Sequence, residues 1–317
     1  MSEVNRRLAM LAAIWAVLIL APLWMPLVGG YTALGTRVMV LGLGAMSVNF
    51  LLGFTGVLSF GHAAWFGLGA YGCGLLLKFV ALSTPLGLLA GTLLGGILGG
   101  LLGALIVRRR GVYFAMVTIA FGQVFYYIAF QWSSLTGGDD GLRPFYRQPL
   151  HLGVATVDIL HDSTAFYYFV LVSFALATAL MGFILRSPFG RTMLAIRENE
   201  RRARFLGIPV EMHIWIAFTL SCFFMAFAGS LYALLNNFAD PRGLHYSQSG
   251  DFVMMAVLGG MRTFWGPLLG AVVFVMLQDY ISSITINWQI FIGLFYVACV
   301  LFFPRGVLGI LRRKATT

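Results

Sequence analysis

The sequence predicts an all-α protein, a polytopic bundle of transmembrane helices, and three observations lead to this fold class. Hydrophobic residues make up 60% of the 317 residues and charged residues only 10%, whereas a typical soluble domain has about 25% charged residues. The apolar residues form long runs, most of them close to the roughly 20 residues that a membrane-spanning helix needs. The 38 glycines suit close helix contacts in lipid, where small residues let backbones approach.

We expect a single transmembrane domain over residues 1–317 with about ten spans, and eight if two weak segments are re-entrant. Both termini are expected in the cytoplasm, where basic residues flanking spans are retained, because Arg6 and Arg7 precede the first span and Arg312–Lys314 follow the last. The predicted spans in chain order are Leu8–Val28, Val38–Phe54, the glycine-rich region Gly53–Gly74, Pro85–Val107, Gly111–Trp132, Ala165–Leu185, Ile214–Leu235, Tyr246–Met261, Phe264–Ser282 and Trp288–Phe303.

Two long polar intervals separate the spans. The interval 186–213 holds six arginines within nineteen residues, so it is expected on the cytoplasmic side. Ser187 is a suitable N-cap ahead of Pro188, and a short amphipathic helix is expected from about Asn199 to Leu206, ended by Gly207. The interval 133–163 holds only two basic residues and is expected on the periplasmic side.

The glycine-rich region Gly53–Gly74 has two interpretations. Dense glycine is poor helix material. In a membrane it marks either tight helix packing, with hydroxyls bonded to nearby carbonyls, or a broken helix that lines a substrate path. Thr55, Ser59 and His62 supply polar groups there, and Asn49 in the preceding span requires a polar partner. A second cluster near Gly259–Gly270 hints at two related halves of the chain.

Several functions are disfavoured by the sequence. There is no G-x-x-x-x-G-K-[ST] phosphate loop, so the chain is not expected to be an enzyme that hydrolyses ATP alone. The five histidines show no metal-binding spacing, and no metal site is expected. The net charge of +10 gathers at the ends of apolar runs, which indicates membrane topology and lipid contact rather than nucleic-acid binding.

Four stretches resemble one family. The loop AIRENERRARFLGIPV, the stretch Gly53–Tyr71, the stretch Gly111–Gln123 and the stretch Ser249–Ala271 resemble motifs of the LivM/LivH-type permeases, in the family's order. These are membrane subunits of ATP-binding-cassette (ABC) importers for branched-chain amino acids and related small molecules. Gln123 stands where many members have Glu, Asp251 replaces the usual Glu, and Arg262 replaces a common Gly. The turn LTGGDDGL also resembles a family turn.

The resemblance implies roles for particular residues. The loop would dock in a separate ATPase through Arg197, Glu198, Asn199, Glu200, Ala203, Leu206 and Gly207. The substrate-pathway candidates are Asn49, Thr55, Ser59, His62, Thr118, Gln123 and Asp251. The turn at Thr136, Gly137, Gly138 and Gly141 is either a simple hairpin turn or a periplasmic gate.

The resemblance also implies partners and a location. A second, LivH-like permease subunit, one or two ABC ATPases and a periplasmic binding protein would complete an importer in the bacterial inner membrane. ATP and magnesium would belong to the ATPase, with no cofactor on this chain. The alternatives are an autonomous secondary transporter, which needs intramembrane titratable groups that are few here, and for the loop 186–213 a basic anchor on anionic lipid.

Overall fold

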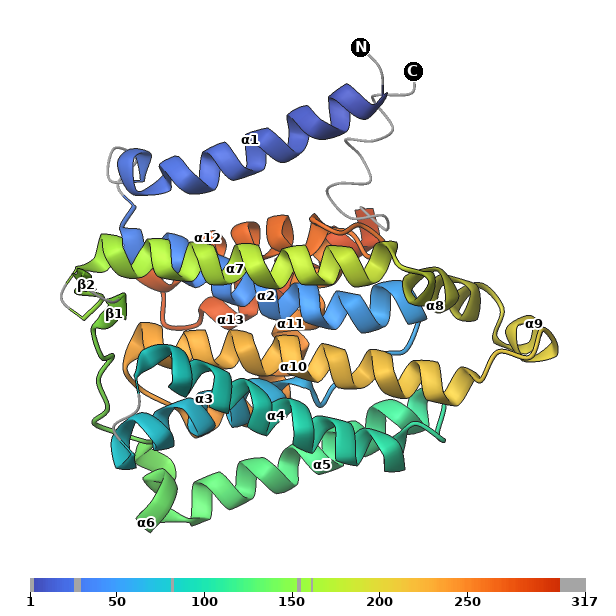
Figure 1. Cartoon of the computed structure of the whole chain (residues 1–317), viewed down its shortest axis with the longest axis horizontal. Coiled ribbons are helices and arrows are strands. Elements are labelled where there is room, and N and C mark those ends of the chain that lie inside the picture. The colour runs from blue at the N-terminus through green and yellow to red at the C-terminus, as the bar shows by residue number, and fades with distance from the viewer. Residues whose placement is uncertain (1–2, 26–29, 81–82, 153–154, 161, 303–317) are drawn as a thin grey trace.

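A computed structural model gives the structure of the protein for residues 3–25, 30–80, 83–152, 155–160 and 162–302. The basic C-terminal residues on which the predicted orientation partly depends lie outside the described residues. Ten longer helices form the bundle (Figure 1): α1 (Glu3–Trp24), α2 (Thr32–Thr55), α3 (His62–Phe79), α4 (Thr84–Ile106), α5 (Val112–Gln131), α7 (Ser163–Arg186), α10 (Val210–Asn236), α11 (Tyr246–Gly259), α12 (Gly266–Ile284) and α13 (Trp288–Phe302).

The short elements gather at the two ends of the bundle (Figure 1). The α8–α9 end carries α8 (Pro188–Glu198) and α9 (Glu200–Phe205). The opposite end carries α6 (Ser133–Thr136), the 3₁₀ helix η2 (Gly138–Asp140) and a two-stranded antiparallel hairpin of β1 (Leu150–Leu152) and β2 (Ala155–Val157). We call it the hairpin end. The 3₁₀ helix η3 (Pro241–Leu244) precedes α11.

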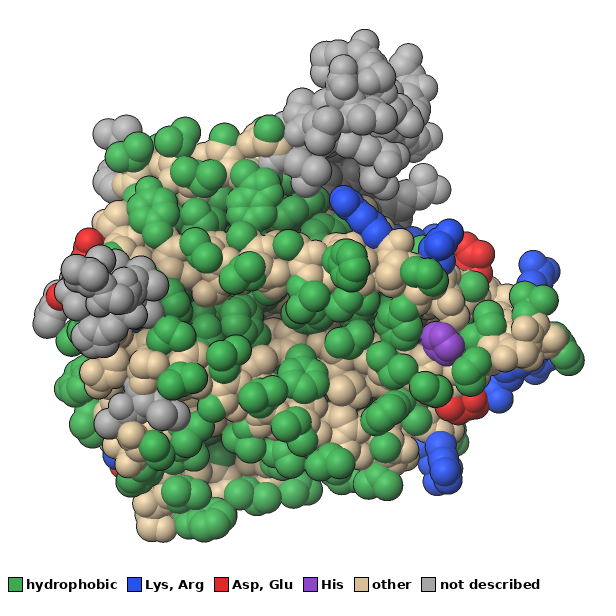
Figure 2. All heavy atoms as spheres, in the orientation of Figure 1, with side chains coloured by type: hydrophobic (Ala, Val, Ile, Leu, Met, Phe, Trp, Pro, Cys, Tyr) green, Lys and Arg blue, Asp and Glu red, His purple; other side chains and the backbone are tan. Residues whose placement is uncertain are grey.

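The all-helical prediction is confirmed apart from the small hairpin, and each of the ten predicted spans corresponds to one helix. Six helices, α2, α4, α5, α7, α10 and α12, are long and apolar enough to cross a membrane. The other four are shorter or carry shorter apolar stretches, so the number of crossings stays a prediction. Figure 2 shows apolar side chains covering the visible flank, with charged side chains concentrated at the α8–α9 end. This distribution fits a protein whose flank faces lipid.

Two of the shorter helices begin in the middle of the bundle. The backbone N–H of Ala63, in the first turn of α3, donates to Ser249 Oγ, in the first turn of α11, at 2.8 Å. From this junction α3 runs to the hairpin end, where Lys78 donates to the Arg143 carbonyl. In contrast, α11 runs toward the α8–α9 end, to a turn near the end of α2. The Thr263 carbonyl in this turn accepts a hydrogen bond from Asn49 of α2. The helices α3 and α11 therefore run in opposite directions from a shared start.

A non-α segment leads into each of these two helices. Residues 56–61 return from the end of α2 to α3, and residues 237–245 return from the end of α10 to α11. The helices α2 and α10 are the two most enclosed spans. The helix α10 packs on α3 and α4, and α2 packs on α11 and α12. The chain thus holds two halves of inverted direction, an arrangement that places breaks near the middle of a membrane.

The structure has an interruption at the second glycine cluster and a further break that the sequence did not predict. The chain leaves the helix between α11 and α12, at residues 260–265, where the glycines near Gly259–Gly270 indicated. The second break, which leads into α11, lies at 237–245 and was not predicted, and the glycines at 259 and 270 also make a close helix crossing. A Cβ at Gly270 would fall 2.9 Å from the Met255 carbonyl carbon of α11, a distance that real side chains do not tolerate. In the other half, Gly229 of α10 allows the same approach to the Phe66 backbone of α3. Small residues at both crossings let the backbones touch.

Candidate functional site

The loop between α7 and α10 forms two short helices. The predicted start at Ser187 and Pro188 is confirmed, although the Ser187 hydroxyl donates back to the Ile184 carbonyl instead of capping α8. Asn199 caps the second helix, because its side-chain oxygen accepts from the Arg202 N–H at 2.9 Å. The predicted end at Gly207 is confirmed by its left-handed backbone, with φ of +78°. The Asn199–Leu206 helix is therefore confirmed as α9, shorter by one residue at each end.

One face of α9 is anchored to the bundle and the other is free. Ala203 is only 3% exposed and packs in a small cluster with Val107 and Ile214. Phe205 and Leu206, by contrast, are 90% and 74% exposed. We call Phe205 and Leu206 the apolar tip. An exposed apolar pair at the end of a polar loop is a candidate contact surface for a partner.

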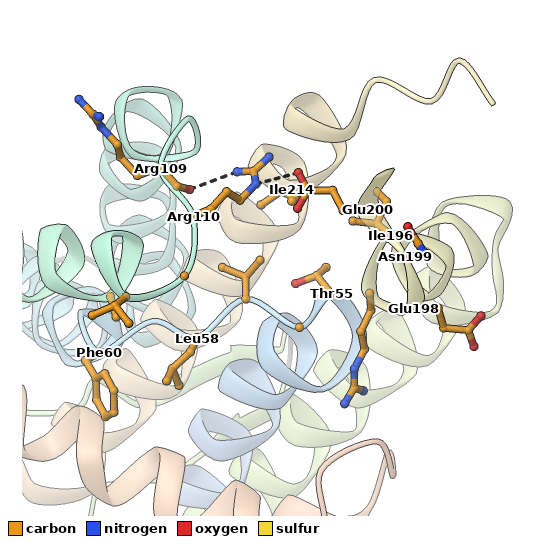
Figure 3. Close-up of a pocket in the computed structure, with 16 residues that line it drawn as sticks. Thr55, Leu58, Phe60, Arg109, Arg110, Ile196, Glu198, Asn199, Glu200 and Ile214 are labelled. Carbon is orange, nitrogen blue, oxygen red and sulfur yellow. Dashed lines mark hydrogen bonds and ion pairs between the residues drawn. The ribbon is translucent and has the colours of Figure 1, made fainter. Parts of the chain in front are cut away.

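An ion network fixes the polar side of the loop. Glu200 Oε1 accepts from Arg110 Nε at 3.0 Å and from Arg204 Nη2 at 2.8 Å, and Arg204 also pairs with Glu211 at 2.5 Å. Partial burial raises the pKa of Glu200, but the hydrogen bonds from Arg204 and Arg110 outweigh it and leave the pKa below its ordinary value. Glu200 therefore has partners within its own chain. Glu198 borders a neighbouring cavity, with its carboxylate directed outward (Figure 3).

A cavity of about 630 Å³ lies between this loop and the first break. Figure 3 shows Thr55, Leu58 and Phe60 on one side of it and Arg110, Asn199 and Glu200 on the other. Arg197 crosses from the loop to the bundle, because its Nη1 donates to the carbonyl of Gly53 in the last turn of α2. The loop is thus bonded to the helix end from which the break begins.

The polar residues around the first break are bonded within the protein. Thr55 Oγ1 donates to the Leu51 carbonyl at 2.5 Å, and Thr118 Oγ1 donates to the Ala115 carbonyl. His62 Nε2 lies 2.8 Å from Ser221 Oγ, and Ser59 Oγ accepts from the Gly61 N–H. The structure therefore has both features that the sequence left open, a broken helix and hydroxyls bonded to nearby groups.

Two predicted amides lie in different settings. Asn49 has the partner that the sequence required, since its Nδ2 donates to the Thr263 carbonyl at 3.0 Å. Gln123 Nε2 is buried and has no hydrogen-bond partner among the described residues.

A second cavity, of about 110 Å³, lies against the second break. Asp251 lines it, together with Arg37 and Gln278, which the sequence analysis missed. Arg37 Nη2 donates to Gln278 Oε1 at 3.0 Å. The missed signal was span length: Val38–Phe54 has seventeen residues, short of the ~20 required. The helix in fact begins six residues earlier, at Thr32, and takes Arg37 into the bundle.

The predicted turn at the hairpin end holds the second break in place. Thr136 Oγ1 donates to the Ala129 carbonyl, and Gly137, Gly138 and Gly141 all have positive φ. Directly after the turn, Leu142 forms an isolated antiparallel bridge with Ala239. The turn therefore buttresses a wall of the second cavity.

Comparison with known protein families identifies the family of this chain. The sequence profile of the family described as "Branched-chain amino acid transport system / permease component" matches residues 30–301. The chain belongs to this family. It is a permease subunit of the ABC-transporter class and a multi-pass membrane protein.

The relatives of this permease cover different shares of the chain. The high-affinity branched-chain amino acid transport system permease protein LivM of Escherichia coli is 28% identical over 94% of this chain and 74% of its own length. The L-arabinose ABC transporter permease AraH of Azospirillum brasilense is 29% identical over 34% of this chain and 33% of its own length. The autoinducer 2 import permease LsrC of Photorhabdus laumondii is 28% identical over 40% of each. Comparison with solved structures finds no match.

The structure does not bring the substrate-pathway candidates of this permease together in one cavity. Only Thr55 and Asp251 line either of the two cavities described; Asn49, Ser59, His62, Thr118 and Gln123 line neither. Thr55, Arg197 and Glu200 line the cavity at the α8–α9 end, and Asp251 lines the cavity toward the hairpin end. Among the described residues, no three His, Cys, Asp or Glu side chains come together in a way that would hold a metal ion.

Proposed function

We propose that this permease translocates branched-chain amino acids or related small polar solutes across the bacterial inner membrane. It acts with a second permease subunit of the LivH type, takes solute from a periplasmic binding protein and is driven by separate ATPase subunits. The family membership and the LivM likeness support this function. The α8–α9 end then faces the cytoplasm, as its arginines favour.

The observation that carries the proposal is the exposed apolar tip of Phe205 and Leu206 on an anchored loop. An apolar pair on a helix that is fixed at its base fits a groove on a partner protein. A lipid anchor is the alternative occupant, because basic amphipathic helices also lie on membranes.

The link from the loop to the spans supports a coupling role. Arg197 follows any movement of α8, and its bond to the Gly53 carbonyl pulls on the last turn of α2. The segment 56–61 that follows is not part of a helix, so it resists displacement less than a span does. Movement of an ATPase against the tip would thereby reach the first cavity.

Partner identification tests the proposal. The tagged chain is extracted from native membranes in mild detergent, and the proteins that accompany it are identified by mass spectrometry. One or two ABC ATPases and a second polytopic subunit are expected. A clean homo-oligomer without any ATPase contradicts the proposal and favours an autonomous secondary transporter.

Matched variants assign the contact to the tip. The double variant Phe205→Ser, Leu206→Ser should lose the ATPases but still insert into the membrane. Met212→Ser is the control, because Met212 is also apolar and 54% exposed but lies on α10 beyond the tip. Loss of ATPase from the control, or its retention by the double variant, contradicts docking at the tip.

A further inference from the structure

The second cavity carries charges of both signs inside the bundle. Its lining includes two arginines, Arg37 and Arg242, and two aspartates, Asp240 and Asp251. Asp240 already accepts from the Arg242 backbone N–H at 2.8 Å. The opposite charges balance, so the cavity favours neither a cation nor an anion. Intramembrane ionisable residues are costly and mark functional sites by default.

Two of these charged groups lack an ionic partner. The carboxylate of Asp251 makes no hydrogen bond or ion pair with another described residue, and Arg37 has no ion pair in the same part of the chain. Arg37 Nε is buried and has no hydrogen-bond partner among the described residues, although Nη2 is held by Gln278. Both residues are half-buried, and a charge held away from water without a partner is destabilising. A ligand that brings both a carboxylate and an ammonium group would satisfy both residues.

The remaining walls indicate the size and polarity of such a ligand. Apolar side chains, including Leu41, Phe66, Met255 and Phe274, line the same cavity. Its volume of about 110 Å³ corresponds to about three or four waters at ~30 Å³ each, so an amino acid with an aliphatic side chain requires the cavity to widen on binding. Arg242, which lines the cavity, is itself exposed to solvent.

We propose that this cavity is a binding site, within this one subunit, for a small zwitterion with an apolar side chain. Arg37 pairs with its carboxylate and Asp251 with its ammonium group. The inference rests on the proposed transport function and deepens it by naming the residues of this subunit that hold the solute. Its position next to the α3–α11 junction makes it a stopping point between the hairpin end and the first cavity.

The site is tested on the purified full-length chain in nanodiscs, without partner subunits. L-Leucine, leucinamide, which lacks the carboxylate, and 4-methylpentanoate, which lacks the ammonium group, are titrated while thermal unfolding is followed. Wild-type protein should show a saturable rise in melting temperature with L-leucine, since a ligand that binds the native state stabilises it. Both single-charge analogues should bind at least about tenfold more weakly, because each loses a charge-assisted bond.

Variants assign the two ends of the ligand. Arg37→Gln should abolish the preference for L-leucine over leucinamide, and Asp251→Asn the preference over 4-methylpentanoate. Asp279→Asn is the matched control, because Asp279 adjoins Gln278 on α12 but bonds to Tyr31 outside the cavity. Ala70→Leu fills the cavity and keeps both charged residues, so it should lose binding of L-leucine. It therefore tests the site independently if Arg37→Gln or Asp251→Asn fails to fold.

The outcomes separate this inference from the proposed function. No saturable stabilisation of monodisperse wild-type protein by L-leucine, L-valine or L-phenylalanine overturns the site. The site is also overturned if leucinamide and 4-methylpentanoate bind as tightly as L-leucine. Arg37 and Asp251 would then not contact the charged groups of the ligand. If ATPases accompany the chain but no amino acid binds, the site alone fails. If an amino acid binds but no ATPase accompanies the chain, the importer proposal alone fails.

Discussion

Replacing Gly229 by alanine tests the backbone crossing of α10 on α3. A Cβ at this position would lie 2.6 Å from the Phe66 carbonyl carbon and 2.9 Å from its Cα. The Phe66 carbonyl oxygen would lie closer still. Favourable carbon–carbon contact begins at about 3.5 Å, so the two helices must separate by more than about 1 Å. The clashing atoms belong to the backbone and cannot rotate away.

The cost follows from this geometry. Overpacking a close-packed interior typically costs about 1–3 kcal/mol, and a clash with backbone places Gly229→Ala at about 3 kcal/mol. One kcal/mol shifts the melting temperature of a domain of this order of size by roughly 2 °C or more. We therefore expect the apparent melting temperature to fall by about 6 °C.

The assay is thermal unfolding of the purified chain in one detergent at one scan rate. Gly250→Ala and Gly293→Ala are the controls, because a Cβ at either position meets nothing within 4 Å. Alanine is the better helix former by about 1 kcal/mol, so neither control should melt below wild type. If Gly229→Ala has the same melting temperature as the controls, the close crossing is not a determinant of stability and the reasoning fails.

Three further predictions concern the loop and the first break. Gly207 has φ of +78°, so Gly207→Val should strain the backbone of the loop, and Glu200→Arg should remove its ion pairs with Arg110 and Arg204. The double variant should lose uptake but still insert into the membrane. Normal uptake would contradict the coupling role. The pKa of Glu200 is lowered in the folded protein from its ordinary 4.5 by its arginine hydrogen bonds. Its stabilisation is therefore present above pH 4.5 and lost as the pH falls through the lower folded value. The melting-temperature difference between wild type and Glu200→Gln should shrink in that acid range, and a constant difference would contradict the pairing. Asn49→Leu should cost about 1–3 kcal/mol in thermal unfolding, because it leaves the Thr263 carbonyl unpaired; an unchanged melting temperature would show that the bond contributes nothing.

Local chemistry made the loop predictable. Ser187 and Pro188 mark the start of α8, and Gly207 ends the following helix, because caps and turns depend on neighbouring residues. The identity of the residues that face outward was not predictable in the same way. Ala203 is buried and Phe205 is exposed, although a soluble helix would show the reverse. The proposed docking of the tip on a partner would account for this departure from the usual pattern.

The break at 237–245 was missed for a different reason. Glycine marked the interruption between α11 and α12, but the segment 237–245 contains no glycine cluster. It contains Asp240 and Arg242, which a hydropathy pattern assigns to solvent outside the membrane. The bridge between Leu142 and Ala239 holds this segment against the bundle. Only contact between distant parts of the chain distinguishes such a segment from an external loop.

The same ambiguity explains why Arg37 was missed, and it bears on the function. A charge at the edge of an apolar run is usually a topological anchor, and Arg37 stands directly before Val38. Once the helix starts at Thr32, that charge lies more than a turn inside the bundle and faces the cavity that Asp251 shares. An anchor tolerates Lys in place of Arg, because only its charge matters. A residue that hydrogen-bonds to Gln278 and pairs with a ligand carboxylate at the same time requires the planar guanidinium of arginine. Arg37→Lys should therefore insert normally and yet bind L-leucine more weakly than wild type; undiminished binding would return Arg37 to the role of an anchor.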